Sequence, residues 1–243
     1  MAKIPKDPKE IFQEITEDYR RELGNDMVSI ILYGSGASGE YVPKKSDLNF
    51  LIVLSEEGIN TLERSFKVVS KWRKRNVEIP LFLTKRYIES SLDSFPIEFL
   101  NMKINHTLVF GEDVLSKLTF EKGHMRVQCE RELKGKLLQL RQGYLDTSQR
   151  AGNMQSLIAR SIPAFMAIFR ALLYIKDMEL PVHKDEILSL ICEVFHMDHG
   201  IFSALLSVKD RENKPSKGEM DSLIHNYIRE IGRLSSIVDE MSV

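Results

Sequence analysis

Residues 32–53, LYGSGASGEYVPKKSDLNFLIV, are the stretch that decides the fold. One apolar run enters it from the N-terminal side (27–33, MVSIILY), and a second forms its C-terminal part (48–54, LNFLIVL). Nearly continuous runs that are rich in β-branched residues are typical of strands buried on both faces. The stretch therefore predicts two buried strands joined by a glycine-rich connection.

The glycines of the connection have the spacing G-x-G-x-x-G, at Gly34, Gly36 and Gly39. In dinucleotide-binding proteins this spacing opens the helix of a strand–helix–strand unit. Residues 39–46 (GEYVPKKS) argue against such a helix, because they contain a glycine, two β-prone residues and a proline. The connection, 35–46, is also barely long enough for a crossover helix. We therefore expect a short turn and not a Rossmann-type crossover.

The second strand opens with SDLN at 46–49. Positions 47 and 49 of an extended strand point to the same face, and they lie close to the backbone amide and hydroxyl groups of Gly34 and Ser35. Phosphoryl and nucleotidyl transfer need oxygen ligands that hold Mg²⁺ and amide donors that hold phosphates. The pattern therefore indicates phosphate chemistry, although Gly34 and Ser35 would also suit an ordinary strand-ending turn.

These residues resemble the signature of the nucleotidyltransferase superfamily that includes DNA polymerase beta. That signature is h-G-S-x-A-x-G, a short spacer, and S-D-x-D on a strand, and here it is matched by 33–39 (YGSGASG) and 46–49 (SDLN). Within the superfamily the chain looks most like the bacterial aminoglycoside nucleotidyltransferases, especially the streptomycin/spectinomycin adenylyltransferases. Further similarity lies in 75–79 (RNVEI, like a V-E-V strand), 95–99 (FPIEF, like a later strand) and 109–113 (VFGED, like a closing turn).

The resemblance implies Mg²⁺ or Mn²⁺ as cofactor, with Asp47, Asn49 and Glu78 as metal ligands. Asp47 and Glu78 would be the catalytic carboxylates, and Glu78 is a candidate ligand or the general base for an acceptor hydroxyl. Asn49 departs from the family, which has aspartate there; it is either a remnant metal position or a hydrogen-bonded core amide. Loss of one such charged group typically lowers a rate by about 10²–10³-fold. Three hypotheses therefore stay open: an active transferase, a degenerate nucleotide-binding or regulatory protein, or a purely structural interaction module that binds no nucleotide.

The same resemblance implies ATP or another nucleoside triphosphate as donor, and a hydroxyl of an unknown small molecule as acceptor of the nucleoside monophosphate. Gly34 and Ser35 would hold the β- and γ-phosphates. Lys45 would steer the triphosphate, although Lys44 and Lys45 also suit solvated loop charges. The resemblance leaves a homodimer open.

Two weaker candidates lie elsewhere. Glu98 stands alone in an apolar stretch. A glutamate in such a place more often pairs with a nearby lysine or arginine than belongs to a functional site. His196 and His199 flank Asp198 and could form a surface metal site, but Gly200 suggests that a helix ends there.

The chain changes character near residue 112. Before it, strand patterns alternate with helical ones, and Pro80 suggests an edge position or a bulge in a third strand over 77–84. The expected helices of this half are 8–23 and 58–76. After it the pattern has helical periodicity only, over 126–148, 154–178, 184–196 and 217–241. We predict an α/β (α+β) fold, with a nucleotidyltransferase-type mixed-sheet domain over 1–112 and a C-terminal all-helical bundle over 113–243.

The composition is that of a globular protein, with 43% hydrophobic and 28% charged residues. The 34 basic residues nearly balance the 35 acidic ones, so nucleic acid is not an expected partner. The most hydrophobic stretch, 156–175, is crossed by two arginines and a proline, which indicates a bundle helix rather than a membrane span. Cys129 and Cys192 lack metal or redox spacing, and no apolar leader is evident. We therefore expect a cytoplasmic protein with reduced cysteines.

Overall fold

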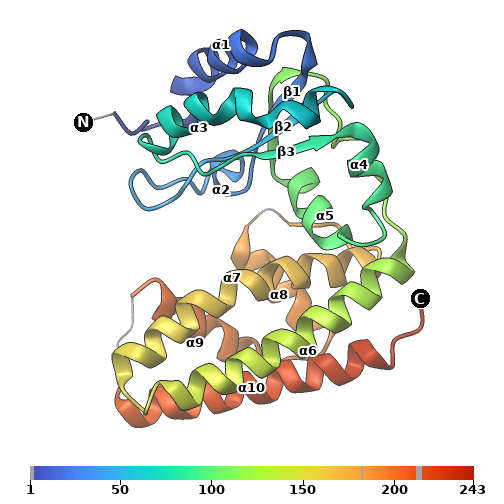
Figure 1. Cartoon of the computed structure of the whole chain (residues 1–243). Coiled ribbons are helices and arrows are strands. Elements are labelled where there is room, and N and C mark those ends of the chain that lie inside the picture. The colour runs from blue at the N-terminus through green and yellow to red at the C-terminus, as the bar shows by residue number, and fades with distance from the viewer. Residues whose placement is uncertain (1–2, 182, 212–214) are drawn as a thin grey trace. The chain divides into compact units, whose positions relative to one another are not determined.

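A computed structural model of the chain describes residues 3–181, 183–211 and 215–243 (Figure 1). The chain divides into two compact units. The first unit comprises Met1–Leu92 with Phe99–Thr119, and the second comprises Asp93–Glu98 with Phe120–Val243. The domain boundary predicted between residues 112 and 113 stays a prediction.

A four-stranded mixed sheet forms the centre of the first unit, with the strand order β3-β2-β1-β4 (Figure 1). Its strands are β1 (Met27–Tyr33), β2 (Asn49–Leu54), β3 (Leu81–Thr84) and β4 (His106–Gly111). β1 pairs antiparallel with both β2 and β4, and β2 pairs parallel with β3. β1 and β2 are almost wholly buried, which confirms the two predicted central strands.

The third strand is shorter than predicted. Val77 forms an isolated parallel bridge with Leu48, and the regular strand begins only at Leu81. Pro80 lies between this bridge and the regular strand, on the segment at the edge of the sheet. An edge position suits proline, because proline has no N–H to donate to a neighbouring strand.

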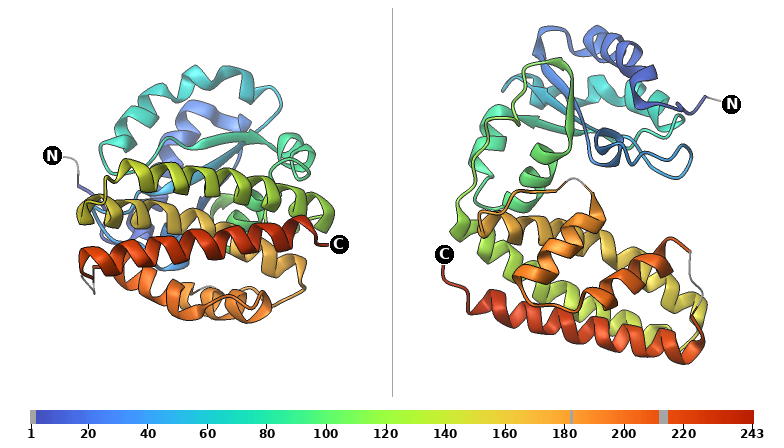
Figure 2. Two further views of the ribbon diagram at one scale, coloured as in Figure 1. Left: turned by 90° about the horizontal axis from the view of Figure 1, so that it is seen from below. Right: turned by 180° about the vertical axis from the view of Figure 1, so that it is seen from behind.

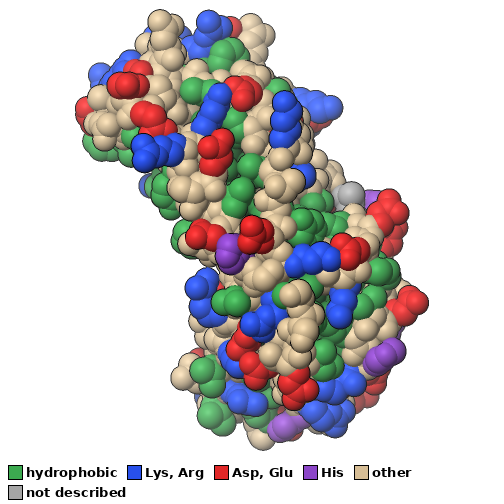
Figure 3. Space-filling model, turned by 90° about the vertical axis from the view of Figure 1, so that its right-hand side faces the viewer, with side chains coloured by type: hydrophobic (Ala, Val, Ile, Leu, Met, Phe, Trp, Pro, Cys, Tyr) green, Lys and Arg blue, Asp and Glu red, His purple; other side chains and the backbone are tan. Residues whose placement is uncertain are grey.

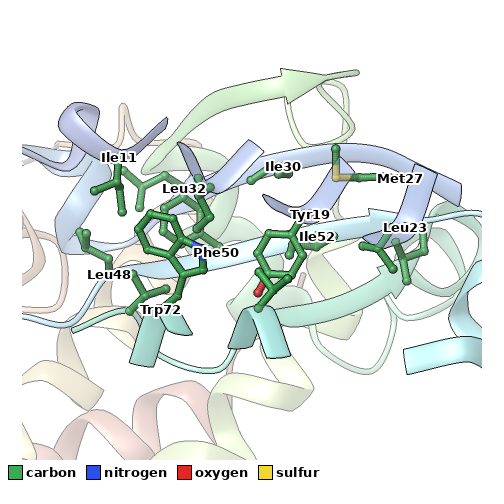
Figure 4. Close-up of a cluster of buried hydrophobic side chains, with 14 residues drawn as sticks. Ile11, Tyr19, Leu23, Met27, Ile30, Leu32, Leu48, Phe50, Ile52 and Trp72 are labelled. Atoms are coloured by element: carbon green, nitrogen blue, oxygen red, sulfur yellow. The ribbon is translucent and has the colours of Figure 1, made fainter. Parts of the chain in front are cut away.

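The helices that belong wholly or partly to the first unit are η1 (Pro8–Ile11), α1 (Phe12–Leu23), η2 (Gly24–Asp26), α2 (Ser35–Ser38), η3 (Gly58–Ser65), α3 (Phe66–Arg73), α4 (Lys85–Ser90) and α5 (Pro96–Ile104), of which α5 has its first residues in the second unit. Buried apolar side chains of η1, α1 and α3 form one core with those of β1 and β2. Trp72 of α3 packs with α1 residues and with Phe50 and Ile52 of β2 (Figure 4). Its indole N–H donates to the buried carboxylate of Asp18 (3.0 Å), which also accepts from Lys71 (2.6 Å). The core therefore lies on one face of the sheet. The alternate residues of β1 and β2 that are not in this core face the other side of the sheet.

The second unit is helical throughout its described residues. Its helices are α6 (Lys122–Asp146), α7 (Ala151–Ile175), α8 (Lys184–Val194), α9 (His199–Lys209) and α10 (Lys217–Asp239). Figure 2 shows α6, α7 and α10 side by side, with α8 and α9 packed on α7. Among the described helices, α7 alone is long and apolar enough to cross a membrane, but 56% of its most apolar window is buried in the structure. It has the burial of a core helix, as the sequence predicted.

Two sequence expectations are wrong. Residues 95–99 do not form a strand: α5 begins at Pro96, a residue that favours a first helical turn, and the N–H of Ile97 donates to Gln128 (2.8 Å). No helix ends at Gly200. Instead α9 begins beside it, because the carboxylate of Asp198 accepts hydrogen bonds from the first-turn amides.

Cys129 and Cys192 are buried and free. Burial raises the pKa of both thiols, to about 11 for Cys192. On the face drawn in Figure 3, acidic and basic side chains are interspersed, and that face carries no broad basic area.

Candidate nucleotide-binding site

A row of polar side chains crosses the sheet at the end where β1 stops. Tyr33, the last residue of β1, pairs with Asn49 on β2 and with His106 on β4. Directly paired residues of adjacent strands direct their side chains to the same face. This face is the one opposite to the α1–α3 core, because Phe50, the next residue along β2, points into that core.

Glu78 joins the row from the segment before β3. Its backbone N–H donates to the carbonyl of Leu48 (3.0 Å), and the N–H of Leu48 donates to the carbonyl of Asn76 (3.0 Å). This parallel bridge sets Glu78 beside Asn49. Burial and the negative charge of Glu78 both raise the pKa of Tyr33. This effect also indicates that Glu78 lies near Tyr33.

Asp47 lies two residues before the start of β2 and is exposed. Burial, Glu10 and Asp47 together raise the pKa of Tyr41, which places the carboxylate of Asp47 near the loop that follows the glycines. The end of this loop is held by Asn76, whose side-chain amide donates to the carbonyl of Ser46 (2.8 Å). The SDLN segment thus closes the loop and starts the strand at the same point.

The glycine connection, where the sequence predicted a short turn, begins with a single helical turn, α2. The amides of Ala37 and Ser38 donate to the carbonyl of Gly34 (2.9 and 3.0 Å). Gly34 before the turn and Gly39 after it have φ values of 72° and 82°, which favour glycine. A crossover helix of the Rossmann type does not follow β1.

Gly34 adjoins the polar row directly. A Cβ atom placed on it would lie 3.7 Å from the side-chain nitrogen of Asn49. Its own N–H donates to the carbonyl of Asn105 (3.0 Å), which fixes the turn against the residue before β4. The structure therefore places Gly34 beside Asn49, which the bridge before β3 sets next to Glu78.

The other predicted residues are less closely placed. Ser35 begins α2 and is half-buried, and Lys45 is exposed on the loop, where its backbone N–H donates to Val42 (3.1 Å). Glu98 belongs to the second unit and accepts a hydrogen bond from Gln128 (2.7 Å). Their roles stay predictions.

A comparison with solved structures identifies the fold. The chain is similar to the crystal structure of spectinomycin adenyltransferase AAD(9) from Enterococcus faecialis with ATP and spectinomycin, with a TM-score of 0.50. The match covers 92% of this chain and 99% of that chain, at 14% sequence identity. The two proteins share one fold. No protein-family model and no curated protein sequence matches the chain.

The likeness in fold agrees with the resemblance drawn from the glycine turn and the SDLN segment. The shared fold includes the mixed sheet and the helices that follow it. At 14% identity the likeness shows the fold alone.

The oxygen donors at the polar row would suit one divalent ion better than two. Among the described residues, no group of three or more His, Cys, Asp and Glu side chains could hold a metal ion. Mg²⁺ is commonly bound through one or two carboxylates together with the phosphates of a substrate. Asp47 and Glu78 would meet that requirement for one nucleotide-bound Mg²⁺ or Mn²⁺, with the amide oxygen of Asn49 as a neutral ligand; these roles stay predictions.

Tyr33 and His106 are members of the row that the sequence analysis missed. Nε2 of His106 bonds to Asp113 (3.1 Å), and Nδ1 bonds to the carbonyl of Lys103 (2.8 Å). Burial opposes ionisation of Asp113, but His106 and backbone amides outweigh it and lower the pKa of this carboxyl. The strand β4 had no clear sequence pattern. For Tyr33 the available signal was its place directly before the glycine turn.

Proposed function

We propose that this protein binds a nucleoside triphosphate at the polar row and transfers its nucleoside monophosphate to a hydroxyl of a small molecule. The observation that carries the proposal is the juxtaposition of Gly34, Asn49 and Glu78 at one end of the sheet. A protein of the same fold was crystallised with ATP and spectinomycin, which supports a nucleotide donor and a small-molecule acceptor.

Each residue has a stated part in the proposed transfer. Gly34 and Ser35 hold the β- and γ-phosphates, and Lys45 attracts the triphosphate to the loop. Asp47 and Asn49, with Glu78 as a further candidate ligand, would hold Mg²⁺ or Mn²⁺, which would neutralise phosphate charge. The acceptor oxygen bonds to the α-phosphorus, the bond to the β-phosphate breaks, and pyrophosphate leaves. Glu78 takes the hydroxyl proton as general base.

A second function is favoured by Asn49. An amide in place of a carboxylate leaves only Asp47 and Glu78 to offset the metal charge, so nucleotide binding could persist without transfer. The chain would then be a nucleotide-binding or regulatory protein that keeps the adenylyltransferase fold.

Calorimetric titration of ATP separates these functions. We expect ATP to bind at least about 10-fold more tightly in Mg²⁺ or Mn²⁺ than in chelator, with pyrophosphate release when a suitable hydroxyl acceptor is supplied. Binding without pyrophosphate release across a broad acceptor panel would favour the second function. No binding under any of these conditions would contradict both.

A pair of glutamate variants locates the site. Glu78→Gln should remove most of the metal-dependent gain in ATP affinity, because it removes one of two carboxylates from the proposed metal site. Glu89→Gln changes an exposed glutamate on α4 and should leave ATP affinity unchanged. Equal affinities for both variants would place the nucleotide away from the polar row.

A further inference from the structure

A hollow of about 240 Å³ lies between α6 and α7 of the second unit. The two helices approach closely at one side of it: a Cβ on Gly143 would lie 2.5 Å from Cδ1 of Leu157. Next to the hollow, Pro163 lies inside α7 and removes one hydrogen bond from that helix. The hollow shares no residue with the polar row of the first unit.

Its lining combines an apolar floor with a small number of polar groups. The floor consists of Leu140, Leu157 and Phe165, all buried. Arg160 and Ser161 lie at the polar side, together with Lys136 and Gln139. An apolar surface with a few convergent polar groups is the composition of small-molecule sites.

The positive charges of the lining are not equivalent. Lys136 is paired with Glu132 (3.1 Å) on its own helix. Arg160 donates from Nε to the carbonyl of Ser156 (3.3 Å), and its guanidinium forms no ion pair with a carboxylate in the described part of the chain. A guanidinium is suited to bind carboxylate or phosphate through two parallel hydrogen bonds.

We propose that this hollow binds a small organic anion, with its carboxylate or phosphate on Arg160 and an apolar body on Leu140, Leu157 and Phe165. An apolar cavity of about 150 Å³ is large enough for benzene. The volume of this hollow, about 240 Å³, therefore leaves room for a ring that carries an anionic group. The site is independent of the proposed nucleotide transfer.

Titration of benzoate and of phenyl phosphate into the full chain tests the proposal. The compound that binds with the higher affinity shows whether the hollow prefers a carboxylate or a phosphate. We expect one of them to bind at millimolar concentration or below, and benzyl alcohol and inorganic phosphate to bind at least 10-fold more weakly. Each of these controls lacks one of the two features that the hollow recognises. Equal binding of inorganic phosphate and phenyl phosphate would overturn the part assigned to the apolar floor.

Three variants assign the binding to the hollow. Arg160→Gln should weaken the anion about 10-fold or more, because charged hydrogen bonds are lost. Ala164→Leu should weaken it similarly by filling the hollow, whereas Arg141→Gln, an exposed arginine of α6 outside the lining, should change nothing. Arg160 is itself exposed, so its variant stays decisive even where Ala164→Leu lowers stability. Unchanged affinity in Arg160→Gln, or no binding of either anion to the wild type, would overturn the proposal.

Discussion

Asn49 stands between Tyr33 and Glu78 in the polar row, so a charge introduced there acts on both neighbours. With asparagine at position 49, the proposed metal site has two carboxylates, Asp47 and Glu78, and one uncharged amide. A third carboxylate at this position would change both the proposed metal affinity and the repulsion between the carboxylates.

We expect Asn49→Asp to be less stable than wild type in chelator and to gain more from Mg²⁺ or Mn²⁺. Neighbouring carboxylates repel one another without metal, and a metal that binds the folded state stabilises it. Melting curves in chelator and in millimolar metal measure both effects, and Asn25→Asp, before the opposite end of β1, controls for an added charge. An equal metal-dependent gain in wild type and mutant would show that 47 and 49 do not form a metal site.

Asp113 predicts a specific pH dependence of stability. Its pKa is lowered in the folded state, so its contribution is present above the unfolded pKa of about 3.9 and is lost as pH falls through the folded value. Asp113→Asn should lower the free energy of unfolding by about 1 kcal/mol at pH 7, because the bonds to His106 and the backbone lose their charge. Urea unfolding at pH 7 and pH 3 should show that the difference narrows in acid. The same difference at both pH values would be inconsistent with this role.

At the scale of elements, two glycines at strand ends have a positive φ. Gly34 follows β1, and Gly111 is the last residue of β4. Gly34 has φ 72° and Gly111 has φ 80°. A Cβ on Gly111 would lie 2.0 Å from the carbonyl oxygen of Val28. The nearest atom to a Cβ on Gly34 would be the side-chain nitrogen of Asn49, at 3.7 Å. A side chain at Gly34 would therefore strain the backbone only. A side chain at Gly111 would strain the backbone and also overlap Val28.

We expect Gly34→Ala to lower the free energy of unfolding by about 1–3 kcal/mol through its backbone conformation, and Gly111→Ala to lower it further. ATP affinity should fall at least about 10-fold in Gly34→Ala, because the altered turn would hold the phosphates. In the folded fraction of Gly111→Ala it should be unchanged. Melting curves and ATP titrations measure the two properties. Wild-type ATP affinity in Gly34→Ala would place the nucleotide site elsewhere.

The beginning of α9 depends on one side chain. The carboxylate of Asp198 accepts from the N–H groups of Gly200 (2.8 Å) and Ile201 (3.4 Å). Asp198→Ala should lower the free energy of unfolding by about 1 kcal/mol, since both donors lose their partner. Asp210→Ala, at the other end of α9, should have a smaller effect because among the described residues its exposed side chain pairs with Lys209 alone. Urea unfolding of the two variants makes the comparison, and equal losses would contradict the capping role.

At the scale of the whole molecule, every described strand lies between Met27 and Gly111. Far-ultraviolet circular dichroism of the isolated fragment 113–243 should therefore show helix only. The fragment lacks Ile97 and Glu98, the hydrogen-bond partners of the buried Gln128, so it should unfold at lower urea than the second unit does in the full chain. A clear strand contribution in the fragment would contradict a helical second domain.

The sequence by itself determined the two central strands, the long helices and the nucleotidyltransferase resemblance. These features depend on local information: an apolar run, a 3.6-residue period, and glycines followed by SDLN within a short stretch. Local patterns report burial and the backbone conformations that a residue tolerates. Pro80 belongs to the same class, since its missing N–H already indicates an edge strand.

Only the tertiary structure decided which residues share the polar row. His106 and Tyr33 join Asn49 because of strand register, and Glu78 does so through a bridge between residues far apart in the sequence. The first turn of α5 likewise has a hydrogen-bond partner, Gln128, on α6. Such partners come from distant parts of the chain, and no local pattern specifies them. The family signature could therefore be found from the sequence, whereas the neighbours that surround it could not.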